Sequence, residues 1–176
     1  MNVLETPRLR LRPFDPGRDA DAMLALLNEP AFLQGIGDRG VRTREQAVTY
    51  LREWAVEHER RHGYAHRAIE TRDTGAFVGS AGLLWRDPLP APHVGYAIAA
   101  AHQGAGYAAE ATRAVLDEAR RQLRQPRVLA IVNPGNAASI RVLQKSGLRR
   151  IGVHAVEGHA ALDLFAIDFA PGHPAT

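Results

Sequence analysis

The chain has 176 residues, of which 45% are hydrophobic and none is cysteine. This length suffices for one domain with a buried core, and we expect a single domain over 1–176 with its core at about 6–170. The absence of cysteine excludes disulfides, thiolate metal sites and cysteine nucleophiles, and we expect no metal site.

The charge is modest, because 22 basic residues face 19 acidic ones and leave a net charge of +3. No compact basic run with interleaved aromatic residues is present, which argues against a nucleic-acid partner. No apolar run approaches the roughly 18 residues of a membrane span, and the first residues lack the apolar core of a signal peptide. We therefore expect a cytoplasmic protein with no membrane partner.

Hydrophobic periodicity and turn residues predict eleven elements in the order β-α-α-β-β-β-α-β-α-β-β. Their expected ranges are 8–12, 19–27, 43–61, 65–70, 76–84, 93–99, 108–123, 128–132, 136–146, 149–153 and 162–169. Two stretches between them are predicted to be loops, 34–41 with three glycines and the proline-rich 87–92. Hairpin-like strands followed by β-α-β-α-β indicate an α/β fold, with a mixed sheet and helices on both faces.

Several helix ends carry capping residues. Thr43 is a predicted N-cap with Gln46 as its capping-box partner three residues later. Asn136 is a predicted N-cap, and Gly147 follows the same helix at the position where glycine commonly ends one.

A glycine-rich turn joins the strand at 93–99 to the helix at 108–123. It consists of Gln103, Gly104, Ala105, Gly106, Tyr107 and Ala108. Glycine lets a main chain approach a ligand closely, and the following helix offers unpaired N–H groups to an anion. The turn lacks the lysine of a Walker A loop and the third glycine of the strict dinucleotide fingerprint. Its residues therefore predict either a phosphate site or a turn that merely needs glycine.

Two short motifs follow one another along the chain, in the order of elements given above. The first consists of Gln103, Gly106 and Ala108, followed by Glu110 and Ala111. The second consists of Asn136, Ser139, Ile140, Val142, Lys145 and Gly147, with Leu148 after the glycine. The element order and these motifs resemble the GNAT superfamily of acetyl-CoA-dependent N-acetyltransferases, in which phenylalanine is usual in place of Leu148. The resemblance is greatest to the Rim-type branch, which acetylates ribosomal-protein N-termini; the opening segment ETPRLRLRPF is also similar to that branch, so the resemblance covers about residues 6–170.

The resemblance implies a GNAT fold, with a mostly antiparallel sheet whose strands 93–99 and 128–132 splay apart at the cofactor site. Acetyl-CoA is the implied cofactor, with its pyrophosphate on the amides of Gln103–Ala108 and its pantetheine arm along Ile98 and Ala100. Asn133 and Asn136 would reach that arm from the far side. Asn136 could equally be only a helix cap, and Asn133 could only shape the turn before Pro134.

Acetyl transfer to an amine requires a neutral amine, a stabilised oxyanion and a proton for the leaving thiolate. By resemblance, the N–H near Ile98 stabilises the oxyanion. Many GNAT enzymes use a tyrosine as acid where this chain has Leu143, so Ser139 is the candidate proton donor, unless it only bonds to its own helix. Glu157 is the candidate base, flanked by His154 and His159, although such loop residues are often simply solvated.

Four further residues have both a structural and a functional interpretation. Glu110 is expected to hold the cofactor helix, and Asp163 either orients an amine or lies on a strand face. Tyr96 and Trp85 are candidates to line the acceptor pocket, if they are not core aromatics. The loops 34–41 and 87–92 are expected to shape that pocket.

The predicted function is transfer of acetyl from acetyl-CoA to a primary amine, on a small molecule or a peptide N-terminus, in a ternary complex. Two alternatives stay open: a non-catalytic acyl-CoA-binding domain, and a module that binds a different nucleotide or nucleic acid. The oligomeric state is not readable from the sequence, and a homodimer is possible.

Overall fold

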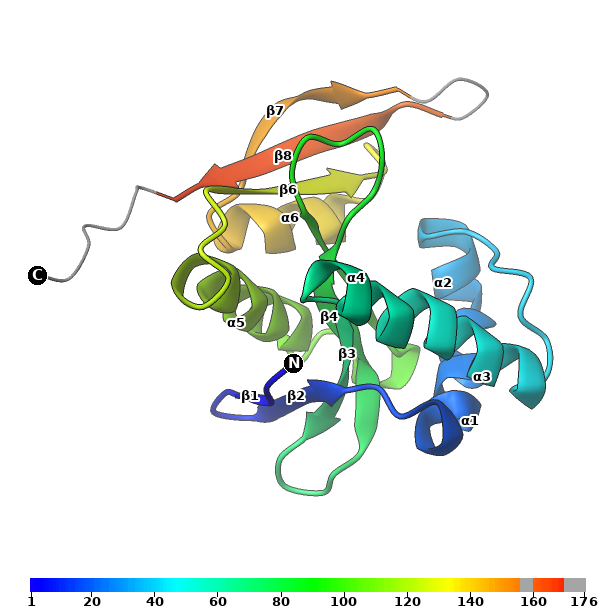
Figure 1. Cartoon of the computed structure of the whole chain (residues 1–176). Coiled ribbons are helices and arrows are strands. Elements are labelled where there is room, and N and C mark those ends of the chain that lie inside the picture. The colour runs from blue at the N-terminus through cyan, green and yellow to red at the C-terminus, as the bar shows by residue number, and fades with distance from the viewer. Residues whose placement is uncertain (156–159, 170–176) are drawn as a thin grey trace, which may run out of the picture.

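A computed structural model describes residues 1–155 and 160–169 of the chain. Eight strands form one sheet in the order β1-β2-β3-β4-β5-β6-β8-β7 (Figure 1). The strands are β1 (Leu4–Glu5), β2 (Leu9–Pro13), β3 (His66–Thr71), β4 (Phe77–Leu84), β5 (His93–Ile98), β6 (Arg127–Val132), β7 (Arg149–His154) and β8 (Leu162–Asp168). All neighbours are antiparallel except β5 and β6. The predicted mixed, mostly antiparallel sheet is therefore confirmed, with the short β1 as an unpredicted addition.

Helices cover both faces of the sheet. The main ones are α1 (Pro16–Leu27), α2 (Pro30–Gly35), α3 (Arg44–Leu51), α4 (His58–His62), α5 (Tyr107–Arg121) and α6 (Ala137–Lys145). A π-helical segment, η1 (Arg52–Glu57), joins α3 to α4, and a 3₁₀ turn, η2 (Ala100–His102), follows β5. In Figure 1, α5 and α6 lie on one side of the central strands and α1 to α4 lie on the other.

Each helical layer has its own apolar core. Val115 and Leu116 of α5 and Leu143 of α6 pack with strand residues such as Ile69 on one face. Met23 and Leu26 of α1 pack with residues of α3, η1 and the strands on the other face. Since each face is closed by helices, the sheet is buried on both sides at its centre.

Local signals explain where the helices begin. Asp15 accepts hydrogen bonds from the amides of Gly17 (2.8 Å) and Arg18 (3.1 Å), so α1 starts at Pro16, three residues before its predicted start. Thr43 and Gln46 form the predicted capping box at α3. The prediction of a loop at 34–41 is wrong at its start, because Gln34 and Gly35 belong to the short helix α2.

A buried charge network fixes α1 to the sheet. The guanidinium of Arg12 on β2 donates to both carboxylate oxygens of Asp19 on α1, each at 2.7 Å. It also donates to Glu70 on β3, at 2.7 and 2.9 Å. All three side chains are buried, and each carboxylate is held by the charge-assisted bonds that a buried charge requires. The network therefore sets the position of the helix that borders the cleft described below.

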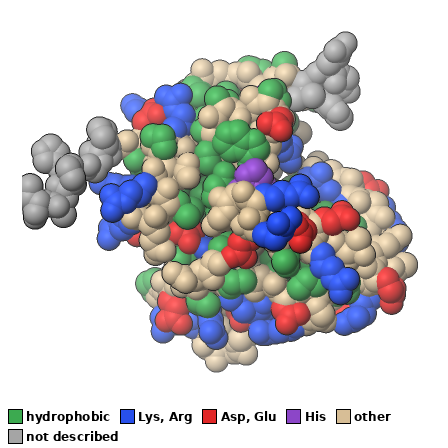
Figure 2. Space-filling view, viewed as in Figure 1, with side chains coloured by type: hydrophobic (Ala, Val, Ile, Leu, Met, Phe, Trp, Pro, Cys, Tyr) green, Lys and Arg blue, Asp and Glu red, His purple; other side chains and the backbone are tan. Residues whose placement is uncertain are grey.

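Charge is mixed over the surface that Figure 2 shows, where basic side chains are interspersed with acidic ones. Within the described residues, no helix combines the length and apolarity that crossing a membrane requires. In that same part of the chain, no group of three histidine or acidic residues is placed to hold a metal ion.

Candidate active site

Strands β5 and β6 are neighbours in the sheet, yet they pair only at one position. His93 is in register with Leu129, and the Leu129 amide donates to the carbonyl of Pro92 at 2.9 Å. On its other side β5 pairs with β4, where the Ala99 amide donates to Val78 at 3.0 Å. Because antiparallel bonding alternates, the main-chain groups of Tyr96 and Ile98 point away from β4, towards the gap. The gap therefore presents the N–H groups of Tyr96 and Ile98 without a strand partner, whereas the Ile98 carbonyl accepts from the Gln103 side chain.

A cleft of about 1170 Å³ runs through this gap. Its walls come from β5, β6, the glycine turn, α6 and the helices of the opposite face. Nine of the residues assigned from the sequence to cofactor binding or to proton transfer line it, namely Ile98, Gln103, Gly104, Gly106, Tyr107, Ala108, Asn133, Asn136 and Ser139. The side chains of Ala100 and Ala105 are not part of the lining, although their main chains belong to the same turn.

The glycine turn ends in an open helix N-terminus. Gly104 (φ +80°) and Gly106 (φ +83°) both adopt the left-handed conformation that other residues avoid. Gly106 is the N-cap of α5, and no side chain caps the helix. The Glu110 amide donates to the Gly106 carbonyl at 3.1 Å, which is the first bond of the helix, so the amides before it lack an intrahelical partner. This arrangement suits an anion such as a phosphate.

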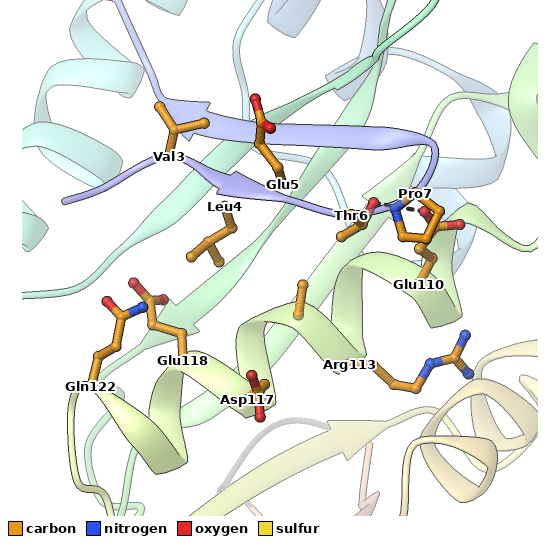
Figure 3. Close-up of a pocket in the computed structure, with 11 residues that line it drawn as sticks. Val3, Leu4, Glu5, Thr6, Pro7, Glu110, Arg113, Asp117, Glu118 and Gln122 are labelled. Atoms are coloured by element: carbon orange, nitrogen blue, oxygen red, sulfur yellow. Dashed lines mark hydrogen bonds between the residues drawn. The ribbon is translucent and has the colours of Figure 1, made fainter.

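Arg8 and Glu110 hold this turn in place. Glu110 accepts from the Thr6 hydroxyl at 2.6 Å (Figure 3). It also accepts from the Arg8 amide at 3.0 Å. Arg8 pairs with the Glu110 carboxylate at 2.7 Å and donates to the Ala105 carbonyl at 2.8 Å. Burial opposes ionisation of Glu110, but the bonds from Thr6 and Arg8 prevail and lower the pKa of its carboxyl. The predicted structural role of Glu110 is confirmed, and Arg8 was not anticipated from the sequence.

Ser139 faces the gap rather than its own helix. Its Oγ lies 2.7 Å from the phenol oxygen of Tyr96, so a hydroxyl pair bridges α6 and β5. Burial raises the pKa of Tyr96, which therefore stays protonated at neutral pH. Asn136 caps α6 by accepting from the Ser139 amide at 3.0 Å, and Asn133 accepts from Gly135 at 3.0 Å within its turn. Asn136 is thus a helix cap and Asn133 shapes its turn, and the side chains of both also line the cleft.

The far side of the cleft has an aromatic wall that the sequence did not indicate. Trp54 of η1 lies between Tyr50, with ring centroids 5.3 Å apart, and His66 of β3, at 4.5 Å. Arg39 and Arg86 also line this part. Burial and the charge of Arg39 lower the pKa of Arg86. Within the described chain the charged side chains of the lining, Arg39, Arg86, Arg141 and Lys145, are all basic.

Other candidates lie elsewhere. The prediction that Trp85 lines the pocket is wrong, because its indole donates to Asp87 at 3.1 Å and its side chain is exposed. The loop 87–92 does not line the cleft, since Leu89 and Ala91 are buried against Leu129. Asp163 of β8 forms an ion pair with Arg150 of β7 at 2.6 Å, which links the two strands. His154 ends β7 outside the lining, and Glu157 and His159 lie outside the described residues.

Comparison with known proteins identifies the family. The model of the acetyltransferase (GNAT) domain matches residues 8–149. Among curated proteins of Bacillus subtilis, YkkB, an uncharacterised protein, is 33% identical over 150 residues, covering 82% of this chain and 84% of its own. The uncharacterised N-acetyltransferase YoaA is 30% identical over 155 residues, covering 86% and 85%.

A solved structure of Mycobacterium smegmatis RimJ, in complex with a CoA disulfide, superposes with a TM-score of 0.77 at 26% identity. The match covers 95% of this chain and 86% of RimJ. The chain is therefore an acetyltransferase that belongs to the GNAT family.

Proposed function

We propose that this acetyltransferase moves the acetyl group of acetyl-CoA directly to a primary amine, with both substrates bound in one ternary complex. The observation that carries the proposal is the hydroxyl pair of Tyr96 and Ser139, 2.7 Å apart, beside the unpaired main chain of β5. A proton donor and two main-chain amides without a strand partner, those of Tyr96 and Ile98, thus meet in one cleft, as acyl transfer to an amine requires.

The residues of the cleft fit acetyl-CoA. The uncapped amides after Gly106 suit its pyrophosphate, and the main chain of Ile98 suits the amides of its pantetheine arm. Gln103 already donates to the Ile98 carbonyl at 3.0 Å, and Glu29 accepts from the Ala100 amide at 2.9 Å. Both side chains thus occupy main-chain groups that we assign to pantetheine. Acetyl-CoA supplies an activated thioester, and RimJ, a relative with the same fold, is known in a CoA complex.

The chain's own residues then have distinct roles. The Ile98 N–H stabilises the negative charge that develops on the acetyl oxygen, because an amide fixed in a strand is an effective donor to a developing oxyanion. The Ser139 hydroxyl protonates the departing thiolate, and the Tyr96 phenol orients that hydroxyl. Asn136 holds Ser139 through its amide bond. Glu157, the base proposed from the sequence, lies outside the described residues.

The acceptor is proposed to be an α-amine of a protein N-terminus or a small primary amine. The resemblance to the Rim-type branch supports the first. An α-amine has a pKa of about 7.7–8.0, so a useful fraction is neutral and nucleophilic at neutral pH.

Calorimetric titration with acetyl-CoA tests the proposal, with ATP and NAD as control ligands. Selective binding in the micromolar range is expected, followed by acetylation of members of a panel of amines and N-terminal peptides. Gly106→Val should abolish binding, because a β-branched side chain is forced into the left-handed region at the phosphate turn. Preferred binding of ATP, or binding of acetyl-CoA without turnover of any amine, would contradict the proposal.

A further inference from the structure

The side chain of His66 lies over the two neighbouring strands, β4 and β5, at positions where both carry glycine. In register, His66 of β3 faces Gly82 of β4, and Gly82 faces Gly95 of β5. A Cβ on Gly95 would stand 3.1 Å from Nε2 of His66 and 3.3 Å from its Cε1. The imidazole therefore extends over β5 and fills the space that glycine leaves there.

The buried imidazole has a nitrogen without a partner. His66 is 5% exposed, and its Nε2 makes no hydrogen bond within the described structure. Nδ1 lies 3.5 Å from the Ser80 Oγ, the outer limit of a hydrogen bond, and Trp54 lies against the ring at 4.5 Å between centroids. A buried polar atom without a partner costs free energy, so its survival requires an explanation. His66, Ser80 and Trp54 all line the cleft, but Nε2 itself is covered in the free protein, so a bound molecule supplies the partner only after a small shift of the ring or of a neighbour.

Nε2 lies next to the gap where transfer is proposed. Gly95 immediately precedes Tyr96, whose main chain faces the gap and whose phenol contacts Ser139. Side chains alternate along a strand, so the Tyr96 ring and the His66 imidazole lie on opposite faces of β5. The Ser139 hydroxyl thus approaches the gap from the α5 and α6 face, and Nε2 from the α1 and α3 face. The two groups suit the two proton transfers, one on each side of the acetyl carbon.

We propose that His66, rather than Glu157, accepts the proton of the acceptor amine, an inference that rests on the function proposed above. The neutral amine nitrogen forms a bond to the acetyl carbon, and the carbon–sulfur bond breaks with its electron pair going to sulfur. Nε2 of His66 takes one proton from the nitrogen and later releases it to solvent. Ser139 gives a proton to the thiolate and regains one from solvent, so the amide and a free thiol are the products.

Burial keeps the ring of His66 in its neutral form, and the lowered pKa also makes it a weaker base than a free imidazole. Burial, followed by the charges of His93, His58 and Arg67, lowers the pKa of His66 well below its ordinary value of 6.5. The ring is therefore neutral at physiological pH and keeps a lone pair available to accept a proton.

The test compares His66→Gln with His62→Gln, an exposed histidine outside the cleft lining. Thiol release from acetyl-CoA is measured with a panel of N-terminal peptides and small primary amines. The chain has no cysteine to interfere with a thiol reagent. His66→Gln should lower kcat/KM by about 100-fold, the lower end of the range for general-base catalysis, with unchanged acetyl-CoA affinity and thermal midpoint. His62→Gln should match the wild type.

A second variant covers the case in which glutamine disrupts folding. His66→Ala leaves a cavity beside Trp54, and added imidazoles of graded pKa should restore turnover, faster as the imidazole pKa rises. A purely structural histidine would give no such dependence on pKa.

Three results would overturn the inference. The first is wild-type kcat/KM in folded His66→Gln, the second is rescue independent of imidazole pKa, and the third is a loss in Glu157→Gln that His66→Gln lacks. Wild-type protein that turns over no amine would refute the proposed function itself, and so the two failures are distinguishable.

Discussion

Removing either member of the hydroxyl pair tests which residue protonates the thiolate. In Tyr96→Phe the ring stays in the core and only the phenol oxygen, 2.7 Å from Ser139 Oγ, is lost. A neutral hydrogen bond is worth about 0.5–1.5 kcal/mol net, which corresponds to about a 2- to 13-fold loss in kcat if the bond only orients Ser139. Ser139→Ala removes the proposed proton donor itself, and a loss of about 100-fold or more is expected.

The double variant gives the decisive comparison. Because Tyr96 acts through Ser139, Tyr96→Phe should have no further effect once Ser139 is alanine. The assay is the thiol-release rate at saturating acetyl-CoA, with calorimetry to show that acetyl-CoA affinity is unchanged. Tyr64→Phe, which removes a phenol oxygen from a buried tyrosine outside the cleft lining, is the matched control.

Two outcomes would refute this reasoning. If the fold-reduction of kcat in the double variant equals the product of the two single fold-reductions, the hydroxyls act independently. If Tyr96→Phe is more damaging than Ser139→Ala, then Tyr96 is the donor.

Three further predictions concern stability and cofactor binding. The buried side chains of Glu118 and Arg67 form an ion pair with two hydrogen bonds, one of them 2.8 Å long. Glu118→Gln breaks this pair and should lower the free energy of unfolding, measured with denaturant, by about 3–5 kcal/mol. Glu29→Ala frees the Ala100 amide and should tighten acetyl-CoA binding by about 2- to 13-fold in calorimetry. Burial and the charge of Arg86 lower the pKa of His93 from 6.5 to about 4. Between pH 6.5 and 4, His93 is therefore protonated in the unfolded chain and neutral in the folded one. The contribution of His93 to the free energy of unfolding should therefore fall by up to about 3 kcal/mol as the pH drops through that window, and should be retained above it.

Each of these has a control variant or a result that would contradict it. Asp117→Asn breaks an exposed pair with Arg121 in the same helix and should cost about 1 kcal/mol at most. An equal loss in both variants would contradict the argument from burial. Weaker acetyl-CoA binding in Glu29→Ala would show that the carboxylate helps to hold the cofactor. His93→Gln should reduce the fall in stability between pH 6.5 and 4, with the rest of the fall coming from His58 and His66, whose pKa values burial also lowers. An unchanged profile would assign the acid sensitivity to those other groups.

Much of the fold could be predicted because its signals are local. The capping box of Thr43 and Gln46 involves residues three positions apart, and Gly147 ends α6 in the left-handed conformation (φ +91°) that its place after the helix indicated. The mixed sheet followed from the order of the elements. By contrast, α2 was missed because its six residues, PAFLQG, include proline and glycine and no side chain caps them.

The site was predictable only where residues close in sequence act together. The glycine turn and the start of α6 each form a short motif, and both line the cleft. The contact of Tyr96 with Ser139 joins residues 43 positions apart, and the approach of His66 to Gly95 depends on strand register. Neither could be read from periodicity. Trp85 was misassigned because an aromatic residue after a strand can turn either way, and here it bonds to Asp87.

The single register pair between β5 and β6 divides the sheet into a five-stranded and a three-stranded part in the free protein. Amide hydrogens of Tyr96 and Ile98, which lack a strand partner, should exchange with solvent rapidly, while those bonded to β4 exchange slowly. A ligand that binds in the gap and bonds to both strands replaces the missing hydrogen bonds between them, and it stabilises only the folded state. Cofactor supply would then set how firmly the C-terminal hairpin of β7 and β8 is joined to the rest of the molecule, and thus how long the chain resists a protease.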